Sequence, residues 1–235
     1  MSSTGAAWVF GVGGIGSAIL DRLSSDRQVI GFDKAPVASA HPVYQVDLCD
    51  RAALKRAAES AARCYGWPEV LILTAGRVSG LRVEDSSEAD ACNLIFDNIL
   101  PAINVLHAAY HLGQPRTRTC ILVTSNAAVA ARPGQPVYAA AKAAVASLAR
   151  SLAASWSSAG IRILAVAPGT VMVDRNRHAV ASRYPDAPLD PGRPGGRLLQ
   201  PPELAEFIAC ILPHAGHLTG QLITLDGGST LPGLK

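Results

Sequence analysis

Seven short apolar runs alternate along this chain with longer helical stretches, and this alternation limits the folds that the chain can adopt. The expected strands are residues 6–10, 28–32, 43–46, 70–74, 119–124, 161–167 and 221–225, and the expected helices lie near 15–24, 51–65, 90–111, 137–157 and 202–212. Strands that are apolar throughout and are joined by helices of about ten or more residues indicate a parallel sheet covered on both faces. Since no internal repeat or linker interrupts the pattern, the 235 residues predict one α/β domain.

The composition excludes several classes of protein. A hydrophobic content of 49% is too high for a disordered chain, yet no run reaches the ~18 apolar residues of a membrane helix. Aromatic residues make up only 5% and the arginines are scattered, which argues against a nucleic-acid partner. The first residues carry no basic segment, so we expect no signal peptide and a cytoplasmic protein.

The cysteines and histidines give no sign of a disulfide or a metal site. The five cysteines are odd in number, lie far apart and form no CxxC pair, so we expect reduced, small core residues. His107 and His111 are four residues apart but lack the flanking glutamate of a zinc-hydrolase helix. No metal is therefore predicted.

A glycine-rich turn follows the first expected strand and opens the first expected helix. Gly11, Gly13 and Gly16 match G-x-G-x-x-G, whose glycines permit a tight turn, approach of the backbone to a pyrophosphate, and close packing of helix on strand. Asp33 follows the second expected strand, where a carboxylate accepts hydrogen bonds from the adenosine ribose and repels a 2′-phosphate. The sequence thus predicts a dinucleotide site that prefers NAD to NADP, although Lys34 could offset part of the repulsion.

Further landmarks occur in order along the chain. Ser125 precedes Tyr138-Ala-Ala-Ala-Lys142 by 13 residues. Asp47, Ala75-Gly76, Asn98, Pro168-Gly169 and Asp226-Gly-Gly228 stand near the other expected strands and helices. With the glycine turn, these residues resemble the short-chain dehydrogenase/reductase family over nearly the whole chain. The resemblance implies a single doubly wound, Rossmann-like domain with a parallel seven-stranded sheet in the order 3-2-1-4-5-6-7 and helices on both faces.

The resemblance also implies the site residues. The expected catalytic residues are Asn98, Ser125, Tyr138 and Lys142. The expected cofactor-binding residues are Gly11, Gly13, Gly14, Ile15, Gly16, Asp33, Asp47, Leu48, Ala75, Gly76, Tyr138, Lys142, Pro168, Gly169, Thr170 and Val171. A free phenol with a pKa of ~10 is a poor base at neutral pH, and an ammonium one helical turn away favours the phenolate.

Three positions depart from the family pattern. Phe10 stands where the usual, longer turn has its first glycine, and Thr74 replaces an asparagine. Val173 stands where a threonine often contacts the nicotinamide carboxamide, so that contact would come from the backbone or from Thr170.

The sequence predicts an enzyme that moves hydride between NAD(H) and a secondary alcohol or ketone. One alternative is an NADPH-dependent ketoreductase for a 3-oxoacyl group. The other is a non-catalytic dinucleotide-binding sensor or scaffold on the same fold.

A segment rich in Pro, Gly and Arg, at about 174–200, is expected to cover a small-molecule substrate. The candidate substrate-binding residues are Arg77, Asn126, Arg175 and Arg177. Because guanidinium groups bind carboxylates in a bidentate manner, we expect an anionic substrate. The competing interpretation is that the arginines make a loop rich in Pro and Gly soluble, or that they pair with residues of another subunit.

The stretch 139–154 is rich in alanine. Small side chains permit close approach of helices, and in related proteins this helix lies at a subunit interface. We therefore expect a homodimer or homotetramer.

Overall fold

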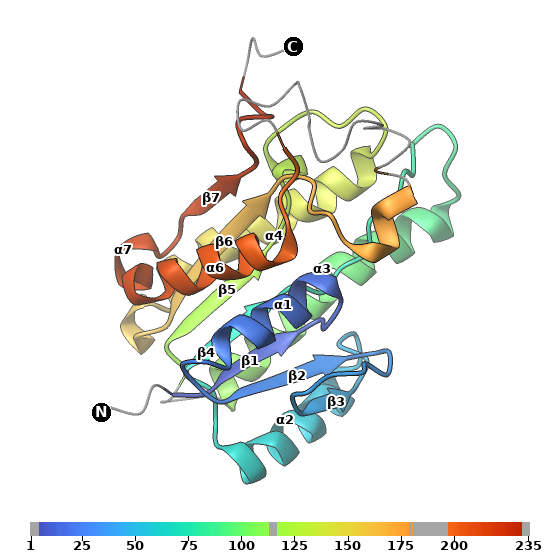
Figure 1. Cartoon of the computed structure of the whole chain (residues 1–235). Helices are drawn as coiled ribbons and strands as arrows, with labels where there is room; N and C mark the ends of the chain where they lie inside the picture. The colour runs from blue at the N-terminus through green and yellow to red at the C-terminus, as the bar shows by residue number, and fades with distance from the viewer. Residues whose placement is uncertain (1–4, 113–116, 179, 181–196, 232–235) are drawn as a thin grey trace.

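The computed structural model describes residues 5–112, 117–178, 180 and 197–231. Their strands form one parallel sheet in the order β3-β2-β1-β4-β5-β6-β7, which confirms the predicted fold (Figure 1). The strands are β1 Ala7–Phe10, β2 Val29–Asp33, β3 Val43–Gln45, β4 Val70–Leu73, β5 Thr119–Val123, β6 Arg162–Pro168 and β7 Leu222–Leu225. Each lies within two residues of the expected bounds.

The helices also follow the expected order. They are α1 Gly14–Leu23, α2 Arg51–Tyr65, α3 Glu88–His111, α4 Pro136–Ser155, α6 Pro201–Ile211 and α7 Ala215–Leu218, with short 3₁₀ helices η1 Asn126–Ala128, η2 Ser157–Ala159, η3 Asp174–Asn176 and η4 Leu212–His214. Helix α3 begins two residues before its expected start because the side chain of Ser87 accepts a hydrogen bond from the Asp90 N–H and caps it.

Two apolar layers lie on opposite faces of the sheet. On β1, Trp8 and Phe10 pack toward α2, α3 and α4, whereas Ala7 and Val9 pack toward α1 and α6. This alternation follows from the two-residue period of a strand. Figure 1 shows α1 and α6 together on one face of the sheet. Both faces are covered, so the strands need no polar side and read as continuous apolar runs.

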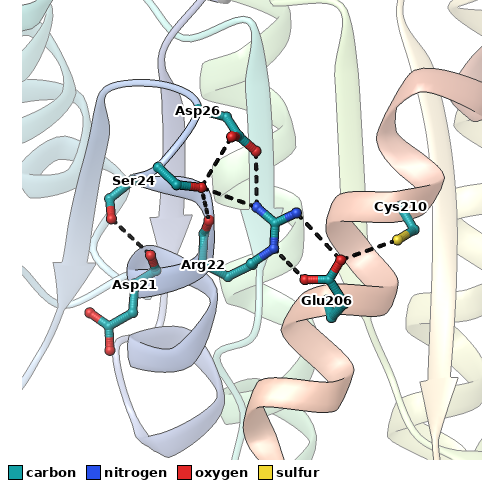
Figure 2. Close-up of polar contacts among 7 residues, drawn as sticks. Asp21, Arg22, Ser24, Asp26, Glu206 and Cys210 are labelled. Carbon is teal, nitrogen blue, oxygen red and sulfur yellow. Dashed lines mark hydrogen bonds and ion pairs between the residues drawn. The ribbon is translucent and has the colours of Figure 1, made fainter.

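Helices α1 and α6 pack against each other although they are far apart in the sequence. The buried residues Ile19 and Leu20 of α1 belong to the same apolar cluster as Ile208 of α6. At the surface, Arg22 pairs with Asp26 at 2.9 Å and with Glu206 of α6 (Figure 2). Because these ion pairs are exposed, the apolar contacts supply most of the stability of this helix pair.

The expectation that all five cysteines are core residues is wrong. Only Cys120 is buried, whereas Cys64, Cys92 and Cys210 are exposed and Cys49 is intermediate. All five are free thiols. The exposed three lie on the outer faces of helices α2, α3 and α6, and sequence spacing alone had not separated these faces from the inner ones.

Within the part of the chain that the structure describes, no helix is long and apolar enough to cross a membrane.

Candidate active site

The carboxyl ends of the central strands surround a cavity of about 380 Å³. Such a position, outside the carboxyl ends of parallel strands where the strand order reverses, is where open α/β sheets bind ligands. The residues that line the cavity are Gly11, Gly13, Gly14, Ile15, Gly16, Asp33, Lys34, Asp47, Leu48, Cys49, Thr74, Ala75, Gly76, Arg77, Asp97, Pro101 and Val173. The structure thus brings together the cofactor residues expected after β1, β2, β3 and β4.

The glycine turn has the shape that a dinucleotide requires. Gly11 has φ +96°, and a Cβ on it would lie 2.5 Å from the Ala75 nitrogen. A Cβ on Gly16 would lie 1.9 Å from the Gly11 carbonyl oxygen, so this position requires glycine. In contrast, a Cβ on Gly13 would meet nothing within 4 Å. The turn is packed tightly at both ends and open at Gly13, where backbone and helix N-terminus face the cavity and fit a pyrophosphate.

Asp33 is fixed at the wall of this cavity. Its Oδ2 accepts a hydrogen bond of 2.6 Å from the Val12 N–H, and its Oδ1 accepts one of 2.9 Å from the Ala35 N–H. A carboxylate has about four lone-pair positions, so both oxygens can still accept from ribose hydroxyls. The same side chain therefore holds the glycine turn and presents negative charge to the cavity.

Lys34 is held by a neighbouring carboxylate. Its Nζ lies 2.8 Å from Oδ2 of Asp47, which follows β3. The hydrogen bond raises the pKa of Lys34 and lowers that of Asp47, whose carboxylate also accepts from the Cys49 N–H. Lys34 thus offsets the charge of Asp47 rather than that of Asp33.

Asn98 and Lys142 converge on Gly76. Asn98 is 1% exposed, and its Nδ2 donates to the carbonyls of Leu94 and Arg77, both at 2.8 Å. Its Oδ1 has no hydrogen-bond partner among the described residues. A Cβ on Gly76 would lie 2.7 Å from this Oδ1 and also 2.7 Å from the Nζ of Lys142. The two polar atoms are therefore separated by no more than twice that distance, at the edge of the cavity.

Tyr138 and Lys142 lie one turn apart on α4. The Lys142 Nζ is 5.8 Å from the centre of the Tyr138 ring, and Lys142 is 5% exposed. The Thr124 hydroxyl at the end of β5 donates to the Lys142 carbonyl at 2.8 Å and so ties α4 to the sheet. Ser125 follows directly, and its Oγ accepts from the Ala127 N–H at 3.1 Å. None of Ser125, Tyr138 and Lys142 lines the cavity, but the Nζ of Lys142 lies beside Gly76, which does.

The chain that follows β6 closes on the glycine turn. The Gly169 N–H donates to the Leu225 carbonyl at 2.9 Å, and Val171 pairs with Leu199 in an isolated parallel bridge. None of the expected residues Pro168, Gly169, Thr170 and Val171 lines the cavity. Val173 does, and its Cγ1 would lie 2.9 Å from a Cβ on Gly14.

The four candidate substrate residues have different surroundings. Arg77 lines the cavity, and its Nε lies 3.3 Å from Oδ2 of Asp97. Arg177 is largely exposed and pairs with Asp174 at 2.8 Å. Asn126 is 3% exposed and bonded to other side chains. The side chain of Arg175, residue 179 and residues 181–196 of the expected flap lie outside the described residues.

Sequence reasoning missed Cys49, Asp97 and Pro101 in the cavity wall. Asp97 precedes Asn98, and Pro101 lies one turn further along the same helix. The helical period applied to Asn98 would have found Pro101, whereas Cys49 is marked only by its position beside Leu48.

Comparison with known proteins identifies the family. The family model described as enoyl-(acyl carrier protein) reductase matches residues 21–230. The 2,3-dihydro-2,3-dihydroxybenzoate dehydrogenase of Escherichia coli is 30% identical over 95% of this chain and 96% of its own. The chain belongs to the short-chain dehydrogenase/reductase family. As in the family, it is an oxidoreductase that acts on CH–OH or carbonyl groups and binds a nicotinamide dinucleotide.

Solved structures share the fold. The structure of gox2181 has a TM-score of 0.88 at 24% identity and covers 97% of this chain and 96% of its own. The structure of ElxO with NADP bound has a TM-score of 0.85 at 21% identity, and it covers 96% of this chain and 98% of its own. The family assignment disfavours the alternative of a non-catalytic sensor or scaffold.

Proposed function

We propose that this oxidoreductase interconverts a secondary alcohol and a ketone with NAD(H), and that Asn98, Ser125, Tyr138 and Lys142 carry the reaction. The observation that supports this most directly is the convergence of Lys142 Nζ and Asn98 Oδ1 on Gly76, beside the cavity that fits the dinucleotide. Tyr138 lies on the same helix face as Lys142, so its hydroxyl can work next to a cation.

In the direction of oxidation, Tyr138 takes the proton of the substrate hydroxyl as general base. The positive charge of Lys142 stabilises the phenolate form of Tyr138 that accepts this proton, and the transfer leaves Tyr138 as the neutral phenol. The Ser125 hydroxyl polarises the reacting oxygen. The buried Oδ1 of Asn98, which has no hydrogen-bond partner among the described residues, would accept a hydrogen bond from a water that links Lys142 to solvent. A nicotinamide dinucleotide, held by the glycine turn and Asp33, would supply the hydride acceptor for the carbinol carbon. In reduction, Tyr138 returns the proton to the carbonyl oxygen.

Cofactor preference follows from the charges at the cavity. Asp33 presents a carboxylate where the adenosine ribose is expected, and Lys34 is engaged by Asp47. Both observations favour NAD. The second candidate, an NADPH-dependent reductase of a 3-oxoacyl group, is favoured by the acyl carrier protein named in the matching family model and by the NADP bound in ElxO. Lys34 would then leave Asp47 for the 2′-phosphate.

We propose that the substrate carries a carboxylate or similar anion. Arg77 is a guanidinium in the cavity wall, and the similar dehydrogenase from Escherichia coli is named for a benzoate derivative. The pair of Arg77 with Asp97 is half exposed, and such pairs contribute little, so an anion can displace it. Arg175 and Arg177 are the further candidates, whereas Asn126 is bonded elsewhere.

The test is turnover of a panel of secondary hydroxy acids and their neutral esters with NAD and with NADP. We expect NADH formation with the acids and a loss of about 10²–10⁴-fold in kcat for Tyr138→Phe, with NADH binding retained. Arg77→Ala should lower kcat/KM for an acid and leave that for its ester unchanged. Half of the wild-type kcat in Tyr138→Phe would refute the catalytic assignment, and preference for the esters would refute the anionic substrate.

We also propose a homodimer or homotetramer in the cytoplasm. Phe96, Ile103 and Tyr110 are exposed on α3, which packs beside the alanine-rich α4, so a second copy could cover this face. The free thiols are typical of a reducing compartment. Light scattering should show a dimer or tetramer that Phe96→Glu dissociates, and a monomeric wild type would overturn the assembly.

A further inference from the structure

A buried polar network joins the loop after β5, which carries Ser125, to the segment that follows β7. The Asn126 Nδ2 lies 3.3 Å from Oδ2 of Asp226 and 3.1 Å from the Oγ of Ser229. Its Oδ1 accepts a hydrogen bond of 2.6 Å from the guanidinium of Arg132. Asn126 is 3% exposed and Asp226 6%. Both ends of this amide are thus satisfied inside the protein, by partners up to 103 positions away in the sequence.

The network contacts both the loop that carries Ser125 and the segment that leads into α4, the helix that carries Tyr138. The Ala128 N–H donates to the Ser125 carbonyl at 2.9 Å, and the Val129 and Ala130 N–H groups donate to the Asn126 carbonyl. Arg132 lies between this loop and α4, and its carbonyl accepts from the Gln135 N–H at 2.9 Å, directly before α4 begins. The amide of Asn126 therefore links the loop of Ser125 to the segment that leads into the helix of Tyr138.

Asp226 supplies a fixed negative charge to this network. Burial raises the pKa of its carboxyl, but hydrogen bonds from Thr230, Ser229, Asn126 and the Gly228 N–H outweigh burial and hold the pKa below the ordinary 3.8. Since an ionised carboxylate only accepts hydrogen bonds, it requires a donor from Asn126. This fixes the orientation of the amide, with Nδ2 toward Asp226 and Oδ1 toward Arg132.

We propose that Asn126 is a positioning residue, which sets the distance between Ser125 and Tyr138 through Asp226 and Arg132 and does not contact substrate. This inference rests on the proposed function only for its effect on turnover. The network itself is a property of the loop and can be tested without turnover.

The first test is a split between turnover and cofactor binding. Asn126→Ala should lower kcat by about 10- to 100-fold, because displacements of ~1 Å in a reacting group cost about 10²-fold. Its affinity for NADH should stay within about twofold of the wild type, since no residue of the network lines the cofactor cavity. The control is Asn104→Ala, which removes an equally buried amide that binds the carbonyls of Leu48 and Cys49 and should weaken NADH binding instead.

The second test is an exchange of the two partners. Asn126→Asp alone sets a second carboxylate against Asp226 and should impair turnover, and Asp226→Asn alone removes the acceptor and should do the same. In the double variant the amide and the carboxylate have changed places, so each donor again has an acceptor and Arg132 faces a carboxylate. We expect kcat within about threefold of the wild type. A double variant as impaired as the sum of its singles would overturn the proposal.

The third test does not use activity. Amide hydrogen exchange of Ala127, Ala128, Val129 and Ala130, measured by NMR, should speed up in Asn126→Ala and return to wild-type rates in the double variant. Unchanged exchange rates in Asn126→Ala would overturn the positioning role. If the wild type turned over no alcohol or ketone while these exchange rates shifted as expected, the proposed function would fail and the positioning network would stand.

Discussion

A methyl group added at Gly76 should separate Asn98 and Lys142, two of the residues proposed to be catalytic. The Cβ of Gly76→Ala would lie 2.7 Å from both Asn98 Oδ1 and Lys142 Nζ, whereas ordinary contacts of a Cβ begin near 3.4 Å. Each polar atom must therefore move by about 0.7 Å or the backbone must shift. Since ~1 Å of misplacement costs about 10²-fold in rate, we expect kcat to fall by about 10- to 100-fold. The accompanying loss of stability should be that of an overpacked site, about 1–3 kcal/mol.

The assay is steady-state turnover at saturating cofactor, with NADH affinity measured by fluorescence and the unfolding free energy measured in urea. Gly216→Ala is the control, because its Cβ would come no closer than 3.5 Å to any atom beyond its chain neighbours and its own helix backbone, on a helix away from the site. A folded Gly76→Ala protein with wild-type kcat would show that the approach of Asn98 and Lys142 to Gly76 has no part in catalysis.

Three other predictions follow from the charges and thiols. Asp33→Ala should shift the ratio of kcat/KM for NAD over NADP toward NADP by at least about tenfold, or ~1.4 kcal/mol, whereas an unchanged ratio would assign selectivity elsewhere. Burial raises the pKa of Cys120 to about 12, so iodoacetamide should label Cys64 and Cys92 in the folded protein and leave Cys120 unlabelled by mass spectrometry. Because the pKa of Asp226 is lowered, the contribution of its carboxylate to stability is present above pH 3.8 and is lost as the pH falls below that value. The difference in unfolding free energy between wild type and Asp226→Asn should therefore shrink below pH 3.8. A difference that stays constant with pH would contradict this.

Most element bounds could be predicted because they depend on local patterns, whereas the strand order was implied by the resemblance to the family. Apolar runs of strand length and helical stretches between them determine a parallel sheet, and the glycine turn identifies its first crossover. The cavity wall could be predicted in large part because the glycine turn and the family resemblance implied its residues, and because carboxyl ends of parallel strands meet at one edge.

The sequence could not show which side chains pair across long separations. The sequence left open whether Lys34 offsets the repulsion of a 2′-phosphate, and it gave no sign that Lys34 pairs with Asp47 on the next strand connection. Asn126 was one of the candidate substrate residues, and no local pattern shows that its amide is bound by Asp226, 100 positions later. Both contacts depend on how separate strands align, which no local period encodes. The surface positions of Cys64, Cys92 and Cys210 show the same limit, because residue type predicts burial only on average.

The packing of α1 against α6 affects how the protein can be made. Arg22 and Glu206 are separated by 184 positions, and α6 covers the apolar side of the helix that begins at the glycine turn. At about 5–20 residues per second, a ribosome needs roughly 10 to 40 s to synthesise the chain between them. During this time Ile19 and Leu20 lack their final cover, although β1 and β2 already exist. The nascent chain thus carries an uncovered apolar helix, directly after the glycine turn of the cofactor cavity, until α6 has been synthesised.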